Sequence, residues 1–165
     1  MKYTVGIITL SDKGSKGQRE DKSGPAIREI LEADGRFKIE EQILLSDNRE
    51  ELEKELLRLC DDLKLNLILT TGGTGLSARD NTPEATLAVA HRQIPGIAEY
   101  MRARSFEITP KAMLSRGVSA MRGSTLIINL PGSPKAVREN LGFIMPALSH
   151  GLDIMLGTGG ECGSD

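Results

Sequence analysis

The sequence contains no tryptophan, and aromatic side chains make up only 3% of its 165 residues. Proteins that bind single-stranded nucleic acid stack bases on such side chains. The chain also lacks an excess of one charge, since 21 lysines and arginines stand against 23 acidic residues and the net charge is −2. A broad positive surface for nucleic acid or anionic membranes is therefore excluded, although a small anion site is not.

Cysteine and long apolar runs are equally scarce. Cys60 and Cys162 are far apart, and His91 and His150 stand alone, so no zinc-binding pattern is present. The first apolar run, Tyr3–Leu10, is too short for a signal peptide and is typical of a strand. No run approaches the length that spans a membrane. We therefore expect a cytoplasmic protein without a membrane partner.

Strand-like and helical patterns alternate along the chain. Apolar, β-branched runs predict strands at Tyr3–Leu10, Phe37–Leu45, Leu65–Thr71 and Thr125–Leu130. Helical periodicity predicts helices at Pro25–Asp34, Asn48–Lys64, Pro83–His91 and Gly96–Phe106, from Pro134, and at Pro146–Met155. This alternation predicts a three-layer α/β/α sandwich with a mostly parallel central sheet. Residues 1–156 are expected to form one domain, and the glycine-rich residues 157–165 a disordered tail.

Local patterns add three narrower expectations. Asp47 and Glu50 are placed as a capping box at the start of the second helix. Thr82, directly before Pro83, is placed as the N-cap of the third helix. The stretch from residue 111 to residue 124 fits a short helix, a hairpin or an irregular crossing, and the pattern does not separate these.

The segments that follow the four predicted strands are expected to meet. In parallel α/β sheets, ligands bind outside the carboxyl ends of the strands. These four segments are rich in small residues, hydroxyl groups and aspartate, and they are Ser11–Gly14, Ser46–Asn48, Thr70–Thr82 and Pro131–Pro134. We therefore expect the functional site along this edge.

The third of these segments has more glycine than a turn needs. Gly72, Gly73 and Gly75 let backbone N–H groups approach a ligand without side chains in the way, and Thr71 and Thr74 add hydroxyl groups. Successive N–H groups of this kind form a concave site for an anion, and phosphate is the natural ligand. The alternative is a glycine-rich turn that binds nothing.

Asp80 and Asp47 are the candidate metal ligands. If Thr82 caps the third helix, Asp80 has no capping role, and a carboxylate beside a phosphate site is typical of Mg²⁺ binding. An Asx-turn within the loop remains the alternative for Asp80. Asp47 ends the second strand and is either a second metal ligand or only a helix cap.

The late segment and the nearby cations have two interpretations each. Ser133 is either an ordinary N-cap or part of an anion site at the helix N-terminus that begins with Pro134. Four cations near the predicted edge could neutralise phosphate or remain solvated surface charges, namely Lys13, Arg79, Lys135 and Arg138.

Two familiar phosphate motifs do not apply. The sequence has no G-x-x-x-x-G-K-[ST] motif. Gly73–Ala78 matches G-x-G-x-x-[GA], but it follows the third strand rather than the first, and the chain continues through Arg79–Thr82 before its helix begins. A dinucleotide site is therefore not indicated.

Three stretches together carry a family resemblance. They are "LSDKGSKGQREDKSG" at residues 10–24, "LTTGGTGLSARDNTPEAT" at 69–86 and "LPGSPKAVRENL" at 130–141. In this combination and order they resemble the molybdopterin adenylyltransferase family, over about residues 3–156. The resemblance implies that the chain binds Mg-ATP and molybdopterin, and that the terminal phosphate of molybdopterin attacks the α-phosphorus of ATP. The products would be adenylylated molybdopterin and pyrophosphate, and no general base is required because the attacking phosphate is already ionised.

The resemblance also implies residue roles and partners. Asp47 and Asp80 match the catalytic and metal-binding aspartates of the family. The expected substrate-binding residues are Ser11, Asp12, Thr71, Gly72, Gly73, Thr74, Gly75, Pro131, Gly132, Ser133 and Lys135. A homotrimer is implied, together with a downstream enzyme that inserts molybdate. The alternatives are a non-catalytic molybdopterin-binding scaffold of the same family and a nucleotide-linked hydrolase that acts on another phosphorylated substrate.

Overall fold

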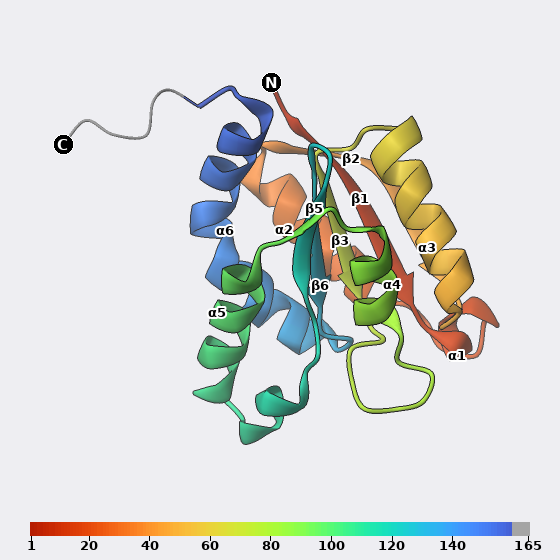
Figure 1. Ribbon diagram of the computed structural model, residues 1–165. Coiled ribbons are helices and arrows are strands. Elements are labelled where there is room, and N and C mark those ends of the chain that lie inside the picture. The colour runs from red at the N-terminus through yellow and green to blue at the C-terminus, as the bar shows by residue number, and fades with distance from the viewer. Residues whose placement is uncertain (160–165) are drawn as a thin grey trace.

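The computed structural model describes residues 1–159, and within them a sheet of strand order β2-β1-β3-β6-β5-β4 lies between helices (Figure 1). The strands are β1 (Tyr3–Leu10), β2 (Phe37–Leu45), β3 (Leu67–Thr71), β4 (Arg92–Gln93), β5 (Ser119–Arg122) and β6 (Thr125–Leu130). β2, β1, β3 and β6 are parallel, whereas β5 and β4 continue the sheet in antiparallel pairing. The predicted three-layer α/β/α sandwich with a mostly parallel sheet is confirmed.

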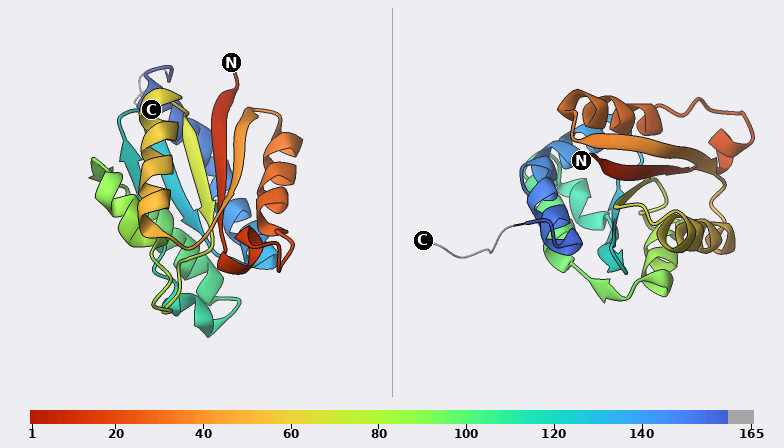
Figure 2. Two further views of the ribbon diagram at one scale, coloured as in Figure 1. Left: turned by 90° about the vertical axis from the view of Figure 1, so that its right-hand side faces the viewer. Right: turned by 90° about the horizontal axis from the view of Figure 1, so that it is seen from above.

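The helices form two layers, one on each face of the sheet (Figure 2). They are α1 (Asp12–Ser15), α2 (Ser23–Asp34), α3 (Arg49–Leu57), α4 (Thr82–Val89), α5 (Pro95–Phe106) and α6 (Pro134–Leu156), with short η1 (Arg58–Asp62) and η2 (Pro110–Leu114). Val5 and Ile7 of β1 pack with α2, α5 and α6, and Ile8 and Leu10 pack with α3 and α4. Because successive side chains of a strand point to opposite faces, a strand covered on both faces is continuously apolar. None of the helices in residues 1–159 is long and apolar enough to cross a membrane.

The strand order creates a crevice at one end of the sheet. β1 has β2 on one side and β3 on the other, so the connections after the neighbouring strands β1 and β3 leave in opposite directions. The loops that follow β1, β2, β3 and β6 form what we call the carboxyl edge, at the lower side of Figure 1. The segments that precede β2, β3 and β6 form the amino edge. Ligand sites of such sheets lie at the carboxyl edge, beside the point where the order reverses.

The last helix differs from the prediction. The two helices expected from Pro134 and from Pro146 are one helix, α6, which continues through Pro146. A proline inside a helix removes one backbone hydrogen bond and usually bends or ends the helix. Here Leu141, Leu148 and Leu152 are buried before and after it, and their packing against the sheet keeps the helix continuous.

The second predicted helix begins and ends differently from expectation. Asn48 is its N-cap, since its side chain accepts a hydrogen bond from the Glu51 N–H at 3.0 Å, so the capping box of Asp47 and Glu50 is wrong. α3 then continues as the π-helical turn η1, and Leu63 is the C-cap of that turn. The π-turn leaves Leu59 fully buried and Leu63 42% exposed.

Two less regular stretches complete the chain. The ambiguous residues 111–124 contain part of η2 and then β5, which pairs with β6 as a hairpin. At the other end, Gly157 takes a left-handed conformation after α6, and the N–H groups of Thr158 and Gly159 donate to the Asp153 carbonyl. The remainder of the predicted tail, 160–165, lies outside the described residues.

Candidate active site

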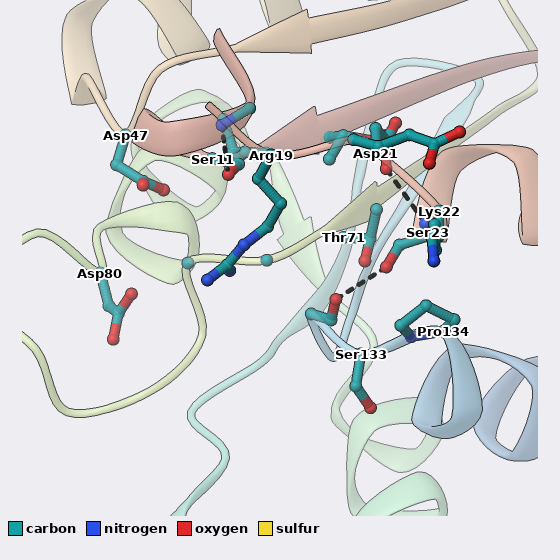
Figure 3. Close-up of a pocket in the computed structure, with 17 residues that line it drawn as sticks. Ser11, Arg19, Asp21, Lys22, Ser23, Asp47, Thr71, Asp80, Ser133 and Pro134 are labelled. Atoms are coloured by element: carbon teal, nitrogen blue, oxygen red, sulfur yellow. Dashed lines mark hydrogen bonds between the residues drawn. The ribbon is translucent and has the colours of Figure 1, made fainter. Parts of the chain in front are cut away.

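A cavity of about 770 Å³ opens at the carboxyl edge beside the ends of β1 and β3. All four predicted segments contribute to its lining, namely Ser11, Asp47, Thr71–Gly73 with Asp80, and Gly132–Pro134 (Figure 3). The topology therefore brings together residues that are up to about 120 positions apart in the chain.

Asp12 and Asp47 join the first two loops. The Asp12 N–H donates to Asp47 Oδ2 at 2.9 Å, and the Asp47 N–H donates to Asp12 Oδ1 at 3.0 Å. Arg79 adds the third loop, because its Nε and its Nη2 donate to the two Asp12 oxygens at 2.9 and 2.8 Å. Arg79 lowers the pKa of Asp12 to about 2. Asp12 is not among the described residues that line the cavity, and its visible role is to tie the loops together.

Asp47 and Asp80 present carboxylates to the cavity (Figure 3). Burial raises the pKa of Asp47; the hydrogen bond from the Asp12 N–H opposes this shift, and the charges of Asp12 and Asp80 add to it. Asp47 therefore holds a partly buried negative charge that is repelled by its neighbours. A cation between the carboxylates would relieve this repulsion.

The donor chemistry suits Mg²⁺ shared with a ligand. No cluster of three or more histidine, cysteine or acidic side chains that could enclose a metal occurs within residues 1–159. Mg²⁺ is typically held by one or two carboxylates together with substrate phosphate oxygens. Asp47 and Asp80 provide those two carboxylates at the same cavity.

Asp80 does not form the Asx-turn of its alternative interpretation, because the Thr82 N–H donates to the Gly73 carbonyl, but its carboxylate does bind the loop locally. Its Oδ2 accepts the Ser77 N–H at 2.9 Å, and its own N–H donates to the Ser77 carbonyl at 3.0 Å. These two bonds close the tip of the loop and fix the direction of the carboxylate. The other oxygen, Oδ1, has no hydrogen-bond partner within residues 1–159.

Thr82 is not the helix cap, and that prediction is wrong. Asn81 precedes the first helical residue, and Thr82 begins α4. The Thr82 hydroxyl donates to the Gly72 carbonyl at 3.0 Å, and its N–H donates to the Gly73 carbonyl at 3.1 Å. Because these carbonyls lie across the loop, Thr82 fastens the start of α4 to the end of β3 instead of capping it.

The glycine-rich loop needs glycine for packing as well as for ligand access. Gly72 and Gly73 have φ angles of 95° and 69°, where side chains are strained. A Cβ on Gly72 would lie 2.4 Å from the Leu10 carbonyl oxygen, and one on Gly73 would lie 2.2 Å from Thr82 Oγ1. Neither position can hold a larger residue without movement of the backbone or of Thr82.

The same loop offers unpaired donors. The Gly72 N–H donates to the Leu130 carbonyl at 3.3 Å. Within residues 1–159 no acceptor pairs with the N–H groups of Gly73, Thr74 or Gly75. Successive free N–H groups form an anion site, so the loop retains the donors that phosphate requires.

The hydroxyl groups at this edge mostly bind protein backbone. Thr71 Oγ1 donates to the Pro131 carbonyl at 2.6 Å, and Ser23 Oγ donates to the Gly132 carbonyl at 2.7 Å. Ser11 and Ser133 act as N-caps, accepting the N–H groups of residues 14 and 136 at 3.0 and 3.2 Å. The capping interpretation of Ser133 is therefore observed, and the N-terminus of α6 nevertheless opens at the cavity.

A second cavity, of about 300 Å³, lies along the same loop. Thr74, Gly75 and Pro131 line this smaller cavity and not the larger one. Its remaining lining is mainly apolar or hydroxyl-bearing and includes Ala98, Met101, Ser105, Ala112, Leu114 and Ser115. The glycine-rich loop thus borders both cavities. Lys135 lines neither of them; its side chain is 82% exposed and lies 3.8 Å from Glu139.

The sequence did not identify the cavity residues in the segment from residue 19 to the start of α2. Arg19, Glu20, Asp21, Lys22 and Ser23 all line the larger cavity. Asp21 binds the N–H groups of Ser23 and residue 24 at 3.0 and 3.1 Å, so it fixes the start of α2. Arg19 has no ion-pair or hydrogen-bond partner in the described part of the chain and extends into the cavity (Figure 3). The polar composition marks this segment as a loop, but it does not show which charge is left unpaired.

Known proteins share this arrangement of fold and motifs. The family described as "Probable molybdopterin binding domain" matches residues 6–150. Molybdopterin adenylyltransferase of Helicobacter pylori (strain J99) is 43% identical over 154 residues, which cover 93% of this chain and 88% of that protein. Molybdopterin adenylyltransferase of Escherichia coli (strain K12) is 44% identical over 139 residues, covering 83% and 71%.

A solved structure agrees with the sequence comparisons. The molybdopterin biosynthesis enzyme MoaB from Thermus thermophilus superposes with a TM-score of 0.89 at 49% identity, covering 94% of this chain and 97% of that one. The resemblance stated from the three motifs is confirmed, and the chain belongs to the family of probable molybdopterin binding domains.

Proposed function

We propose that this protein is a molybdopterin adenylyltransferase of molybdenum cofactor biosynthesis, which transfers AMP from ATP to the terminal phosphate of molybdopterin. The observation that carries the proposal is the pairing of two carboxylates with three unpaired backbone N–H groups at one edge, in a chain whose relatives bear that name. Such a site suits the joining of two polyanions, because the N–H groups offset phosphate charge and the carboxylates can hold a cation that offsets more of it.

The two cavities suit the two substrates. The larger one contains Asp47, Asp80 and the unpaired Arg19, and it fits a nucleotide triphosphate with a cation. The smaller one is mainly apolar with hydroxyl groups, and it fits the flat pterin. Since the loop from Thr71 to Gly75 borders both, the phosphates of the two substrates would meet there.

The reaction is a displacement at phosphorus. An oxygen of the molybdopterin phosphate forms a bond to the α-phosphorus of ATP, and the bond from that phosphorus to the pyrophosphate oxygen breaks. The attacking phosphate is ionised at neutral pH, so no side chain has to remove a proton. The protein contributes by holding the two groups in line, and the N–H groups of Gly73, Thr74 and Gly75 offset the negative charge.

Asp47 and Asp80 would hold Mg²⁺ at this site. When bound, the ion neutralises phosphate charge as a Lewis acid. The two carboxylates are kept in place by the chain itself, Asp47 by the Asp12 N–H and Asp80 by the Ser77 N–H. Asp12 and Arg79 therefore act on the site by positioning Asp47.

We also propose that the protein works in the cytoplasm as a homotrimer and passes its product to a molybdate-inserting enzyme. Exposed apolar side chains near η2 support self-association, since Phe106, Ile108, Met113 and Leu114 are between 50% and 62% exposed. Light scattering should give three times the 17.9 kDa mass of one chain. A monomeric mass would contradict the trimer without touching the proposed reaction.

The decisive experiment is pyrophosphate release. Purified protein with ATP and Mg²⁺ should release pyrophosphate only when molybdopterin is added, and adenylylated molybdopterin should appear in equal amount. Molybdopterin that binds without any release would reject the enzyme and support the scaffold alternative. Release of inorganic phosphate in place of pyrophosphate would support the hydrolase.

A further inference from the structure

Arg116 makes a set of contacts that neither the predicted site nor the proposed reaction explains. It lies between η2 and β5 and reaches the glycine-rich loop from outside. Its backbone N–H donates to the Thr74 carbonyl at 2.8 Å, its Nε to the Gly75 carbonyl at 2.8 Å, and its Nη2 to the Asp80 carbonyl at 2.7 Å. One residue thus holds both the outgoing and the returning limb of the loop.

Glu84 holds the same guanidinium from α4. Arg116 Nη1 donates to Glu84 Oε1, while Glu84 Oε2 is buried and has no partner within residues 1–159. Glu84 lies in the first turn of α4, directly after the loop. The four contacts of Arg116 therefore fix the loop relative to the helix that follows it. A guanidinium can do this because its five donors are fixed in one plane.

The direction of these bonds determines where the loop's donors point. In a trans peptide unit the carbonyl and the N–H point in opposite directions. The carbonyls of Thr74 and Gly75 are turned toward Arg116, so the N–H groups of Gly75 and Leu76 are turned away from it. The Gly75 N–H is one of the unpaired donors described above. The Asp80 carboxylate lies close to Gly75 as well, since a Cβ on Gly75 would be 2.9 Å from Asp80 Oδ2.

We propose that Arg116 is a positioning residue. By holding the carbonyls of Thr74, Gly75 and Asp80, it orients the peptide units of the glycine-rich loop so that the free N–H groups and the Asp80 carboxylate can contact the phosphates at the same time. The inference rests on the proposed function for its effect on turnover. The structural part of the inference is that Arg116 maintains the shape of the loop, and it does not depend on whether the protein has the proposed activity.

Arg122 provides a matched control at the far end of β5. Its Nε and Nη2 donate to Asp61 at 2.9 and 2.8 Å, and its Nη1 donates to the Val89 carbonyl at 2.8 Å. Arg122 thus also joins a carboxylate and a carbonyl, but at the amino edge. The comparison of Arg116→Lys with Arg122→Lys separates the loss of a guanidinium in general from its loss at the loop.

The experiment measures turnover, melting temperature and amide hydrogen exchange for the wild-type protein and for both lysine variants. We expect Arg116→Lys to lower kcat for pyrophosphate release about 100-fold, because a small misplacement of reacting groups has an effect of this size. The KM for ATP should change much less than kcat, and amide exchange should accelerate in residues 72–82. Arg122→Lys should leave kcat and the amide exchange of residues 72–82 unchanged. Its melting temperature should fall by about as much as that of Arg116→Lys.

Each outcome decides the inference. A kcat for Arg116→Lys within threefold of that for Arg122→Lys would overturn the positioning role. If the wild-type protein releases no pyrophosphate, the proposed function fails, and amide exchange then decides alone whether Arg116 holds the loop. Unchanged exchange of residues 72–82 in both Arg116→Lys and Arg116→Ala would overturn the inference in either case.

Discussion

The two edges of the sheet both contain paired polar groups, but they differ in the surroundings of one carboxylate. At the amino edge, Arg122 pairs with Asp61, and Thr125 donates its hydroxyl to the Leu65 carbonyl at 2.6 Å. At the carboxyl edge, the partly buried Asp47 carboxylate faces other negative charges, and Arg19 has no partner among residues 1–159. Paired groups stabilise a fold, whereas a partly buried carboxylate that faces other negative charges, as Asp47 does, is retained where a ligand completes it. Arg19 is exposed, so its lack of a partner does not by itself indicate a ligand. The surroundings of Asp47 therefore support a ligand site at the carboxyl edge without reference to any motif.

Glycines show the same contrast. Gly35 and Gly123 at the amino edge have φ angles of 79° and 53°, and a Cβ there would meet nothing within 4 Å. Gly72 and Gly73 at the carboxyl edge combine a positive φ with close neighbours, since a Cβ on them would lie 2.4 and 2.2 Å from an oxygen atom of another residue. The first pair serves only to turn the chain, and the second also permits close approach of neighbouring segments.

The largest expected effect comes from Asp80. Asp80→Asn should lower kcat for pyrophosphate release about 1,000-fold, roughly 4 kcal/mol in the barrier, because a metal-binding carboxylate is removed. The matched change at the amino edge, Asp61→Asn, should leave kcat unaltered. Steady-state assays of both variants test this, and full activity in Asp80→Asn would remove the metal role from that residue.

The second largest effect is expected for Gly73→Ala, which should lower kcat about 100-fold. The new Cβ would lie 2.2 Å from Thr82 Oγ1 and would displace the start of α4 or the loop. Gly35→Ala should lose only about 1 kcal/mol of stability from its left-handed backbone and keep its activity. Equal activity losses in the two variants would mean that the loop glycines act only through backbone strain.

Arg19→Ala should raise the KM for ATP about tenfold, since one charged contact to phosphate is worth roughly 1.4 kcal/mol or more. Its melting temperature should not change, because the side chain has no partner in the described structure. Arg36→Ala is the opposite case: Arg36 binds Asp34 and Ser149 at 2.6 Å each. We expect it to lower the melting temperature by about 2 °C and to leave KM unchanged.

The smallest effects concern the pH dependence of stability. Burial raises the pKa of Asp47, so its charge opposes folding above the ordinary value of 3.8, and Asp47→Asn should raise the melting temperature at pH 7 by about 2 °C. Arg36 lowers the pKa of Asp34, so that charge favours folding above 3.8, and Asp34→Asn should lower the melting temperature by a similar amount.

Both differences should disappear in acid. The Asp47 penalty vanishes as pH falls through its raised pKa, and the Asp34 benefit is lost as pH falls through its lowered pKa. Melting curves from pH 7 down to about pH 2 therefore provide the check, since the lowered pKa of Asp34 lies below 3.8. The same sign for both substitutions at pH 7 would contradict the contrast between the edges.

Local pattern was sufficient for the layers and for the loops that matter. Leu52, Leu56 and Leu59 recur at helical spacing and are buried against the sheet, and the apolar runs became its parallel strands. Capping was less predictable, because Asn48 and Asp47 are both suitable caps. The choice between them depended on Asp12, 35 positions away, whose N–H binds the Asp47 carboxylate.

Periodicity and motifs are local properties of the chain, and they were enough to predict the α/β/α class, the family and the four loops in which the site residues lie. Which of those residues face the cavity, and which serve as scaffold, depends on contacts between distant segments. The Thr71 hydroxyl donates to the Pro131 carbonyl, 60 positions away, and Arg79 donates to Asp12, 67 positions away. Whether a polar group is paired depends on such distant partners, so the unpaired Arg19, the scaffold role of Asp12 and the hold of Arg116 on the loop emerge only from the folded chain.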